Sequence, residues 1–232
     1  MRQGSLAPTG VLGLKVIKRD PVPPATRELS AWELLKYGLP HFGLTREVAL
    51  WRFKNTPNFW RGFWRVMIAR MFGIATHYGQ VSLTVRRGNG EVIDFGISSL
   101  RVVTDTGVGF IVDAFQNSVE LENMKFHGYG TGGAAEAVGN TALTTELTTQ
   151  YATDNVRPTG STAETAANIY QTVATLSPDT GGTIAITEHG VFSQAATGGG
   201  VMIDRTLFSA VNIVAGSDSL QSDYRLTFTS GS

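Results

Sequence analysis

The spacing of apolar residues along the chain changes near residue 79. Before this point, apolar side chains recur every three or four positions, which is the spacing of a helix with one buried face. The clearest run is Trp60, Phe63, Trp64, Met67, Ile68 and Met71. After it, apolar and polar residues alternate, as in strands that bury one face. The sequence therefore predicts a helical segment followed by a β-rich part.

The first helix is predicted to begin at Ser30, because Ser30 and Glu33 have the spacing of a capping box. In this motif each side chain accepts a hydrogen bond from the backbone N–H group of the other residue. Gly38 and Pro40 are expected to end the helix, since glycine suits a C-terminal cap and proline interrupts helical hydrogen bonding.

Two further helices are predicted, one on each side of Pro57. Thr45 caps the first, over about residues 46–54, and Pro57 closes it. The second covers residues 59–72, with Gly73 as its C-terminal cap. All three predicted helices are therefore short.

The β-rich part begins with a predicted hairpin, in which strands 81–86 and 91–97 flank a turn at residues 87–90. Further strand-like segments cover residues 100–104, 124–129, 168–176, 183–192, 201–211 and 219–229. A short helix is predicted after Thr106, in the apolar run 108–115. Strands at this regular spacing are typical of an antiparallel sandwich or jelly roll.

The first 27 residues form a predicted arm that contains Pro8, Pro21, Pro23 and Pro24. Proline fixes φ and lacks an N–H group, so this arm is expected to be extended and to have no core of its own. The predicted fold is mainly β. An antiparallel β-sandwich or jelly-roll-like C-terminal module over 81–232 follows the extended Pro-rich arm, 1–27, and a short-helix segment, 28–80.

The net charge of zero hides a division between the two ends of the chain. Residues 1–80 hold 12 Lys and Arg against 4 Asp and Glu, whereas residues 81–232 hold 7 against 15. All four tryptophans lie in the basic part. Segments that differ in charge and in aromatic content are predicted to be separate modules, and the basic one is the candidate docking segment.

Glycine and histidine patterns give little support to a cofactor or metal site. Gly128, Gly130 and Gly133 match G-x-G-x-x-G, but Gly139 breaks the helix that a dinucleotide site requires next. A turn with several positive φ angles is the simpler interpretation. The four histidines lack metal-ligand spacing, and the absence of cysteine excludes disulfides and thiolate metal sites.

Glu188, His189 and Asp204 are the one conceivable acid–base set. Adjacent strand residues point to opposite faces, which argues against joint action of Glu188 and His189. Gly190 predicts a bulge in this strand, with Glu188 accepting hydrogen bonds from backbone N–H groups there. The chain is therefore predicted not to be an enzyme, with no cofactor, no metal and no small-molecule substrate.

The start of the chain lacks a signal-peptide-like apolar run, which predicts an intracellular product. The longest apolar segment, 63–75, is interrupted by Arg65 and Arg70 and is not expected to span a bilayer.

The basic, Trp-rich helix has several possible roles. It is compatible with an anionic membrane surface, with nucleic acid, or with an acidic protein surface such as a neighbouring copy. The favoured interpretation is an amphipathic helix in a protein core or interface, because Trp, Met and Phe stripes are normally buried.

Four motifs carry a resemblance to a known family. They are "VVTDTGVGFIVDAFQN" (102–117), "FHGYGTGGAAEAVGNTALTTEL" (126–147), "ITEHGVF" (186–192) and "DRTLFSAVNI" (204–213), followed by "DYRLTFTSG" (223–231). This part of the chain resembles a β-sandwich module of tailed-bacteriophage virion proteins, found in head decoration (cement) proteins and in tail or collar fibres. The resemblance implies a non-enzymatic structural role and symmetric oligomers, and gives no catalytic residue.

A head decoration protein is the favoured function, because an extended arm suits a protein stretched across a capsid lattice. The expected partners are the major capsid protein, whose shell the chain would stabilise, and other copies of the chain. The expected location is the capsid surface of the virion, after synthesis in the host cytoplasm. The predicted docking residues are Trp32, Trp51, Trp60, Arg61, Trp64 and Arg65. A neck, collar or tail component is the alternative, and a membrane-surface or nucleic-acid-binding protein is less favoured.

Overall fold

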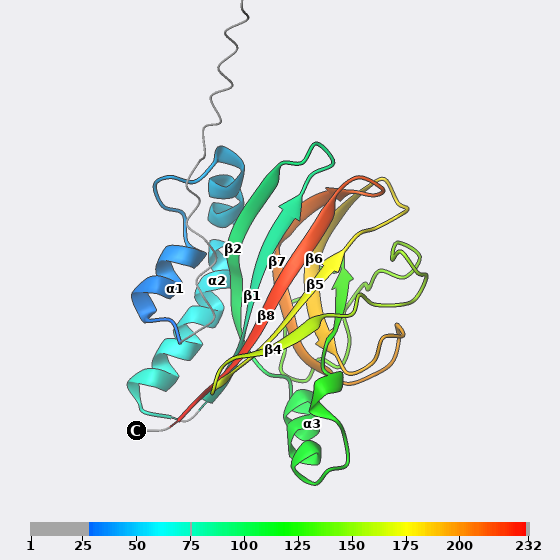
Figure 1. Ribbon diagram of the computed structural model, residues 1–232. Coiled ribbons are helices and arrows are strands. Elements are labelled where there is room, and N and C mark those ends of the chain that lie inside the picture. Colours follow the sequence, from blue (N-terminus) through cyan, green and yellow to red (C-terminus); the bar gives the residue numbers. More distant parts are fainter. Residues whose placement is uncertain (1–27, 75, 231–232) are drawn as a thin grey trace, which may run out of the picture.

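The computed structural model describes residues 28–74 and 76–230 (Figure 1). Two antiparallel β-sheets face each other, and the helices α1 (Ala31–Gly38) and α2 (Arg46–Met71) cover one flank. The described chain is therefore mainly β and consistent with a β-sandwich, as the alternating pattern predicts. The predicted arm, 1–27, lies outside the described residues.

The larger sheet has five strands in the order β2-β1-β8-β5-β4. Their bounds are β1 Thr76–Arg86, β2 Val92–Val102, β4 Ser161–Ala166, β5 Ile169–Leu176 and β8 Ser219–Thr229. The predicted hairpin is confirmed as β1 and β2, although β1 starts at Thr76 and the predicted strand 100–104 is the end of β2. Strand β4 was not predicted, because its exposed residues, "STAETA", lack apolar alternation.

The smaller sheet has three strands in the order β3-β6-β7. Their bounds are β3 Phe126–Gly130, β6 Thr183–Phe192 and β7 Met202–Val214. The bulge predicted at Gly190 is not there, because Gly190 pairs in regular register with Arg205; the register between β6 and β7 shifts instead between Ile186 and Glu188 and between Val191 and Phe192. Helix α3 (Asp105–Phe115) follows β2 as predicted, with Thr104 as its N-cap, and the short 3-10 helix η1 (Leu121–Asn123) follows α3.

Two apolar cores stabilise this arrangement. The main core fills the space between the sheets and includes Val81, Leu83 and Val85 of β1. The second core lies between the helices and the outer side of the large sheet; its buried members are Leu29, Leu34, Phe59, Phe63, Val66, Tyr78, Ile97 and Leu100. A register shift and the positive φ of Gly96 (71°) let β2 contribute to both cores.

Helix α1 confirms the capping box. Ser30 Oγ accepts a hydrogen bond from the Glu33 N–H group, and the Glu33 carboxylate accepts one from the Ser30 N–H group. Each bond satisfies a backbone donor that the first helical turn leaves free.

The prediction of two helices around Pro57 is wrong, because α2 runs unbroken from Arg46 to Met71. An interior proline costs a helix about 3 kcal/mol. Asn55 and Phe59, on either side of Pro57, are completely buried, and burial of a single aromatic side chain offsets much of that cost. The predicted N-cap is correct, since Thr45 accepts from the Val48 N–H group; the C-cap is Phe72, and Gly73, with φ 62°, is the residue that follows it.

Helix α2 also joins the open edges of the two sheets. The Asn55 amide donates to the Ser98 carbonyl of β2 (2.6 Å), and its oxygen accepts from the Ser209 N–H group of β7 (2.9 Å). Trp51 Nε1 donates to the Ser209 carbonyl (2.7 Å), and Arg52 Nε donates to the Phe95 carbonyl of β2 (2.9 Å). These side chains occupy backbone groups that an edge strand would otherwise expose.

Candidate docking face

Helix α2 is apolar on two opposite sides. Its buried residues, at positions 48, 51, 52, 55, 59, 62, 63 and 66, face the two cores. A second series, Leu50, Phe53, Pro57, Trp60, Trp64, Ile68 and Met71, keeps the same three-and-four spacing. At about 100° per residue this series lies opposite the buried one. The described chain buries one of these two apolar sides and leaves the other exposed.

The second apolar series is largely exposed. Trp64 and Phe53 are 56% and 72% exposed, and Leu50, Ile68 and Met71 are about as open to solvent. Trp60 is half-buried and stacks on Trp64, with ring centroids 5.5 Å apart. Contiguous exposed apolar side chains of this size mark interaction sites in soluble proteins.

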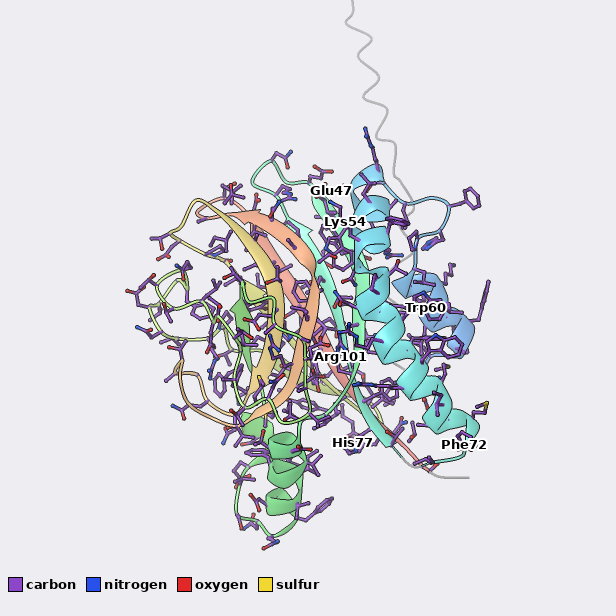
Figure 2. All side chains as sticks on the ribbon, turned by 180° about the vertical axis from the view of Figure 1, so that it is seen from behind. Glu47, Lys54, Trp60, Phe72, His77 and Arg101 are labelled. Atoms are coloured by element: carbon purple, nitrogen blue, oxygen red, sulfur yellow. The ribbon has the colours of Figure 1, made fainter. Side chains whose placement is uncertain are left out.

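The apolar stripe has a basic border. Lys54, Arg61 and Arg65 are all exposed and follow one side of the stripe at helical spacing. Figure 2 shows Trp60 midway along α2, between Lys54 near one end and Phe72 at the other. On helix α1, Trp32 is 75% exposed. An apolar centre with an Arg and Lys border is the composition expected of a protein-binding surface.

The structure separates the six predicted docking residues. Trp32, Trp64, Arg61 and Arg65 are exposed and Trp60 is half-buried. We name the surface of these five residues, together with Ile68 and Met71, the docking face.

Trp51 differs from the other three tryptophans, because it lies in the main core. Its ring centroid is 5.0 Å from that of Phe95, and its Nε1 atom is bound to the Ser209 carbonyl. The Trp51 side chain therefore offers no surface to a partner.

The sequence pattern placed residues of two different sides of α2 on one apolar face, and this prediction is wrong. The sequence pattern grouped Phe63 with Trp64, Ile68 and Met71, yet Phe63 is buried while the other three are exposed. Leu50, Phe53 and Lys54 were missed altogether. Their signal becomes visible only when 46–71 is treated as one helix, because the stripe continues through Pro57.

Glu188 holds the glycine-rich loop that follows β3. Its carboxylate accepts from the N–H groups of Gly132 (3.1 Å), Thr144 (3.0 Å) and Thr145 (2.7 Å), and pairs with Arg205 (2.7 Å). Burial alone would raise the pKa of Glu188, but these N–H groups and the Arg205 guanidinium lower it. Glu188 is thus a structural anion, bonded to this loop rather than to the bulge.

The glycines of that loop do not have the predicted positive φ angles. Gly130 and Gly132 are required by close approach instead, whereas a Cβ atom on Gly133 or Gly139 would meet open space. A Cβ atom on Gly130 would lie 2.5 Å from the Thr145 carbonyl oxygen, and one on Gly132 would lie 2.4 Å from Glu188 Oε1. The loop can therefore close around the Glu188 carboxylate only with glycine at these positions.

His127 and His189 form a buried pair between the sheets. His127 Nδ1 lies 2.9 Å from His189 Nε2 and 2.8 Å from Ser222 Oγ, which in turn lies 2.7 Å from the Tyr129 hydroxyl. Burial lowers the pKa of both histidines, and the neighbouring His189 lowers that of His127 further. The pair is sealed inside the sandwich, and His189 points away from the Glu188 carboxylate, as predicted.

Asp204 is also buried, and burial raises its pKa to about 7. Within residues 28–74 and 76–230, no group of three or more His, Asp and Glu side chains is arranged to hold a metal ion.

Comparisons with known proteins give no family assignment. The sequence matches no protein-family model, and no curated protein is significantly similar to it. Across the described part of the chain, no helix combines the length and the apolar character needed to cross a membrane.

Proposed function

We propose that the docking face attaches this protein to another protein whose surface is apolar and acidic. The observation that carries the proposal is the second apolar stripe of α2, which lies opposite the buried one and has no cover in the described chain. A partner would bury Trp32 and Trp64, and its carboxylates would pair with Arg61 and Arg65.

The partner we propose is the major capsid protein of a tailed bacteriophage, with this chain as a decoration or cement protein on the shell. The resemblance of the β-rich part to phage virion modules supports this choice. The covered flank of the sandwich supports it too, since α2 bonds the edge strands β2 and β7 and so occupies one edge of each sheet, which limits unspecific pairing between copies. Weak contacts repeated over a symmetric lattice add up by valency.

The test is co-sedimentation of the full chain with purified shells that lack it. Trp64→Ser and Arg61→Glu should each weaken binding at least tenfold, a change of about 1.4 kcal/mol in binding free energy. Val156→Ser is the matched control, because Val156 is also exposed but lies in a loop of the β-rich part. Unchanged shell binding by both docking-face variants would contradict the proposal.

A neck, collar or tail component is the alternative, and it would use the same docking face. The number of copies per particle separates the two, since decoration follows the capsid lattice and requires on the order of hundreds of copies. A stained gel of purified particles, quantified against the major capsid band, gives this number.

A second experiment tests whether the partner is a membrane or a nucleic acid instead of a protein. Binding of Arg61 and Arg65 to phosphates would fall steeply with salt, because phosphate contacts release counterions. Co-sedimentation with anionic vesicles and with DNA at two salt concentrations checks this. Strong, salt-sensitive binding to either would replace the capsid proposal.

A further inference from the structure

A second exposed apolar surface lies on α3 and η1, which project from one end of the molecule (Figure 1). One side of α3 is anchored, since Gly107 and Phe110 are buried and the helix contacts β7. The other side carries Val108, Val112 and Phe115 at i, i+4 and i+7, and all three are exposed. Leu121 of η1, six residues after Phe115, is exposed as well. Phe115 is 85% exposed.

This projection is uniformly acidic. Residues 103–124 contain Asp105, Asp113, Glu120 and Glu122, all exposed, and no Lys or Arg. We name the surface of these four acids with Val108, Val112, Phe115 and Leu121 the acidic knob. It combines apolar side chains and negative charge, which is the chemistry that complements a basic, apolar surface.

A basic, apolar surface lies at the other end of the molecule. It consists of Leu50 and Phe53 with the cations Arg46 and Lys54, all of them exposed and three or four positions apart on α2. We name it the basic patch.

The two surfaces cannot meet within one copy. Figure 2 shows Lys54 in the half of α2 that lies away from α3, below Glu47, which pairs with Arg87 in the turn between β1 and β2. The one acid near the patch on α2, Glu47, is turned to Arg87, to which it pairs at 3.0 Å. The patch therefore presents its cations outward, at the end opposite the knob.

We infer that the acidic knob of one copy docks on the basic patch of a second copy. Contact of knob with knob would bring like negative charges together, and contact of patch with patch would do the same for positive charges. Only the head-to-tail combination buries both sets of apolar side chains and pairs Lys54 and Arg46 with carboxylates. Such a contact is heterologous, so copies linked in this way form a ring or an open chain.

This contact goes beyond attachment to a shell and does not depend on it. The basic patch takes the first residues of the exposed α2 stripe, Leu50 and Phe53, with Lys54 of its basic border. The docking face takes the later part of the same stripe, from Trp60 to Met71, so the two are neighbouring parts of one stripe that have no residue in common. A copy can therefore hold its neighbour through the patch and a shell through the docking face.

The test is sedimentation velocity of the full chain over a concentration series, with two double variants. The knob variant carries Asp113→Lys and Phe115→Ser, and the patch variant carries Phe53→Ser and Lys54→Glu. The wild type should associate with rising concentration, less so at high salt. Each variant should associate at least tenfold more weakly, while Val156→Ser associates like the wild type.

Mixing the two variants gives the sharpest result. The patch variant keeps an intact knob and the knob variant keeps an intact patch, so the mixture should form one-to-one dimers and nothing larger. A zero-length carbodiimide cross-linker on the wild type should join Lys54 to an acid of the knob, and isotope-labelled mixtures should show that the link joins different copies. This readout requires no substitution.

Three results would overturn the inference. The first is a wild type that stays monomeric to about 1 mM, the concentration that corresponds to a binding free energy of about −4 kcal/mol. The second is a double variant that is folded and still associates as strongly as the wild type. The third is a cross-link map without any Lys54–knob link between copies.

Discussion

At the scale of single residues, the Asn55 side chain makes two hydrogen bonds that a neighbouring strand would otherwise make with the edge strands β2 and β7. Its amide presents one donor and one acceptor, as a peptide group does, and it bonds β2 and β7 at the same time. No periodicity in the sequence distinguishes this asparagine from an exposed one. Its role depends on two strands that lie about 43 and 154 residues further along the chain.

Asn55→Leu should therefore lower the free energy of unfolding by about 2–6 kcal/mol. Leucine fills the space but leaves the Ser98 carbonyl and the Ser209 N–H group buried without partners, at about 1–3 kcal/mol each. Urea unfolding measures the change. Thr56→Val, on the same helix and half-buried, is the control and should cost under about 1 kcal/mol, because the Thr56 hydroxyl donates to the Arg52 carbonyl of the helix itself and not to a strand. Equal costs for the two variants would mean that Asn55 does not join the sheets.

The buried histidines make stability depend on pH. In the unfolded chain the ordinary pKa is 6.5, whereas burial lowers that of His189 to about 3. As the pH falls from 6.5 towards 3, the unfolded chain binds a proton that the folded chain excludes, so the free energy of unfolding decreases. Asp204 acts in the opposite direction, because its raised pKa lets the folded chain hold a proton that the unfolded chain has lost.

His189→Gln isolates the histidine contribution from that of Asp204. Between pH 6.5 and 4, the free energy of unfolding of the variant should fall less steeply with decreasing pH than that of the wild type, by up to about 1.4 kcal/mol per pH unit. This is the slope that corresponds to the uptake of one proton on unfolding. Urea unfolding at pH 7, 6 and 5 gives both slopes. Parallel slopes would show that His189 is not held neutral in the folded chain.

At the scale of elements, α2 shows what local sequence can and cannot predict. Its N-cap, Thr45, is a local signal and was predicted correctly. Its continuity through Pro57 was not, because the burial of Asn55 and Phe59 against two sheets is a tertiary effect. The buried side was misassigned for a related reason, since a helix with two apolar sides has no single direction that a hydrophobic pattern can identify.

The strands, too, were predicted where local sequence signals mark them and missed where such signals are absent. β6 and β8 were predicted with the bounds that they have, because turn residues mark the ends of each, although buried and exposed residues alternate only in the first half of either strand. β4 was missed, because an exposed edge strand has no buried face to produce alternation. The loop glycines were recognised, but the requirement for close approach to Glu188 depends on a residue some 56 positions away.

The two sides of α2 should respond differently to truncation. Phe59→Ala should cost about 3–5 kcal/mol, because Phe59 is completely buried in the second core. Trp64→Ala should cost under about 1 kcal/mol, since Trp64 is more than half exposed. Thermal unfolding of both variants measures this. A large loss of stability in Trp64→Ala would place Trp64 in the core rather than on a docking face.

At the scale of the whole molecule, α2 contributes side chains to both hydrophobic cores of the β-sandwich. The buried side of α2 contributes Val48 and Trp51 to the main core, and Phe59 and Phe63 to the second. The same helix presents the docking face outward. The division into a segment at 28–80 and a module at 81–232 stays a prediction.

The most direct test of the docking face is hydroxyl-radical footprinting of the protein, free and in purified particles. Trp32, Trp64 and Met71 are open in the described chain and should be oxidised at least several-fold more slowly in the particle. Trp51 is the internal reference, since it is buried in both states and should not change. Equal oxidation of Trp32, Trp64 and Met71 in the two states would contradict the account.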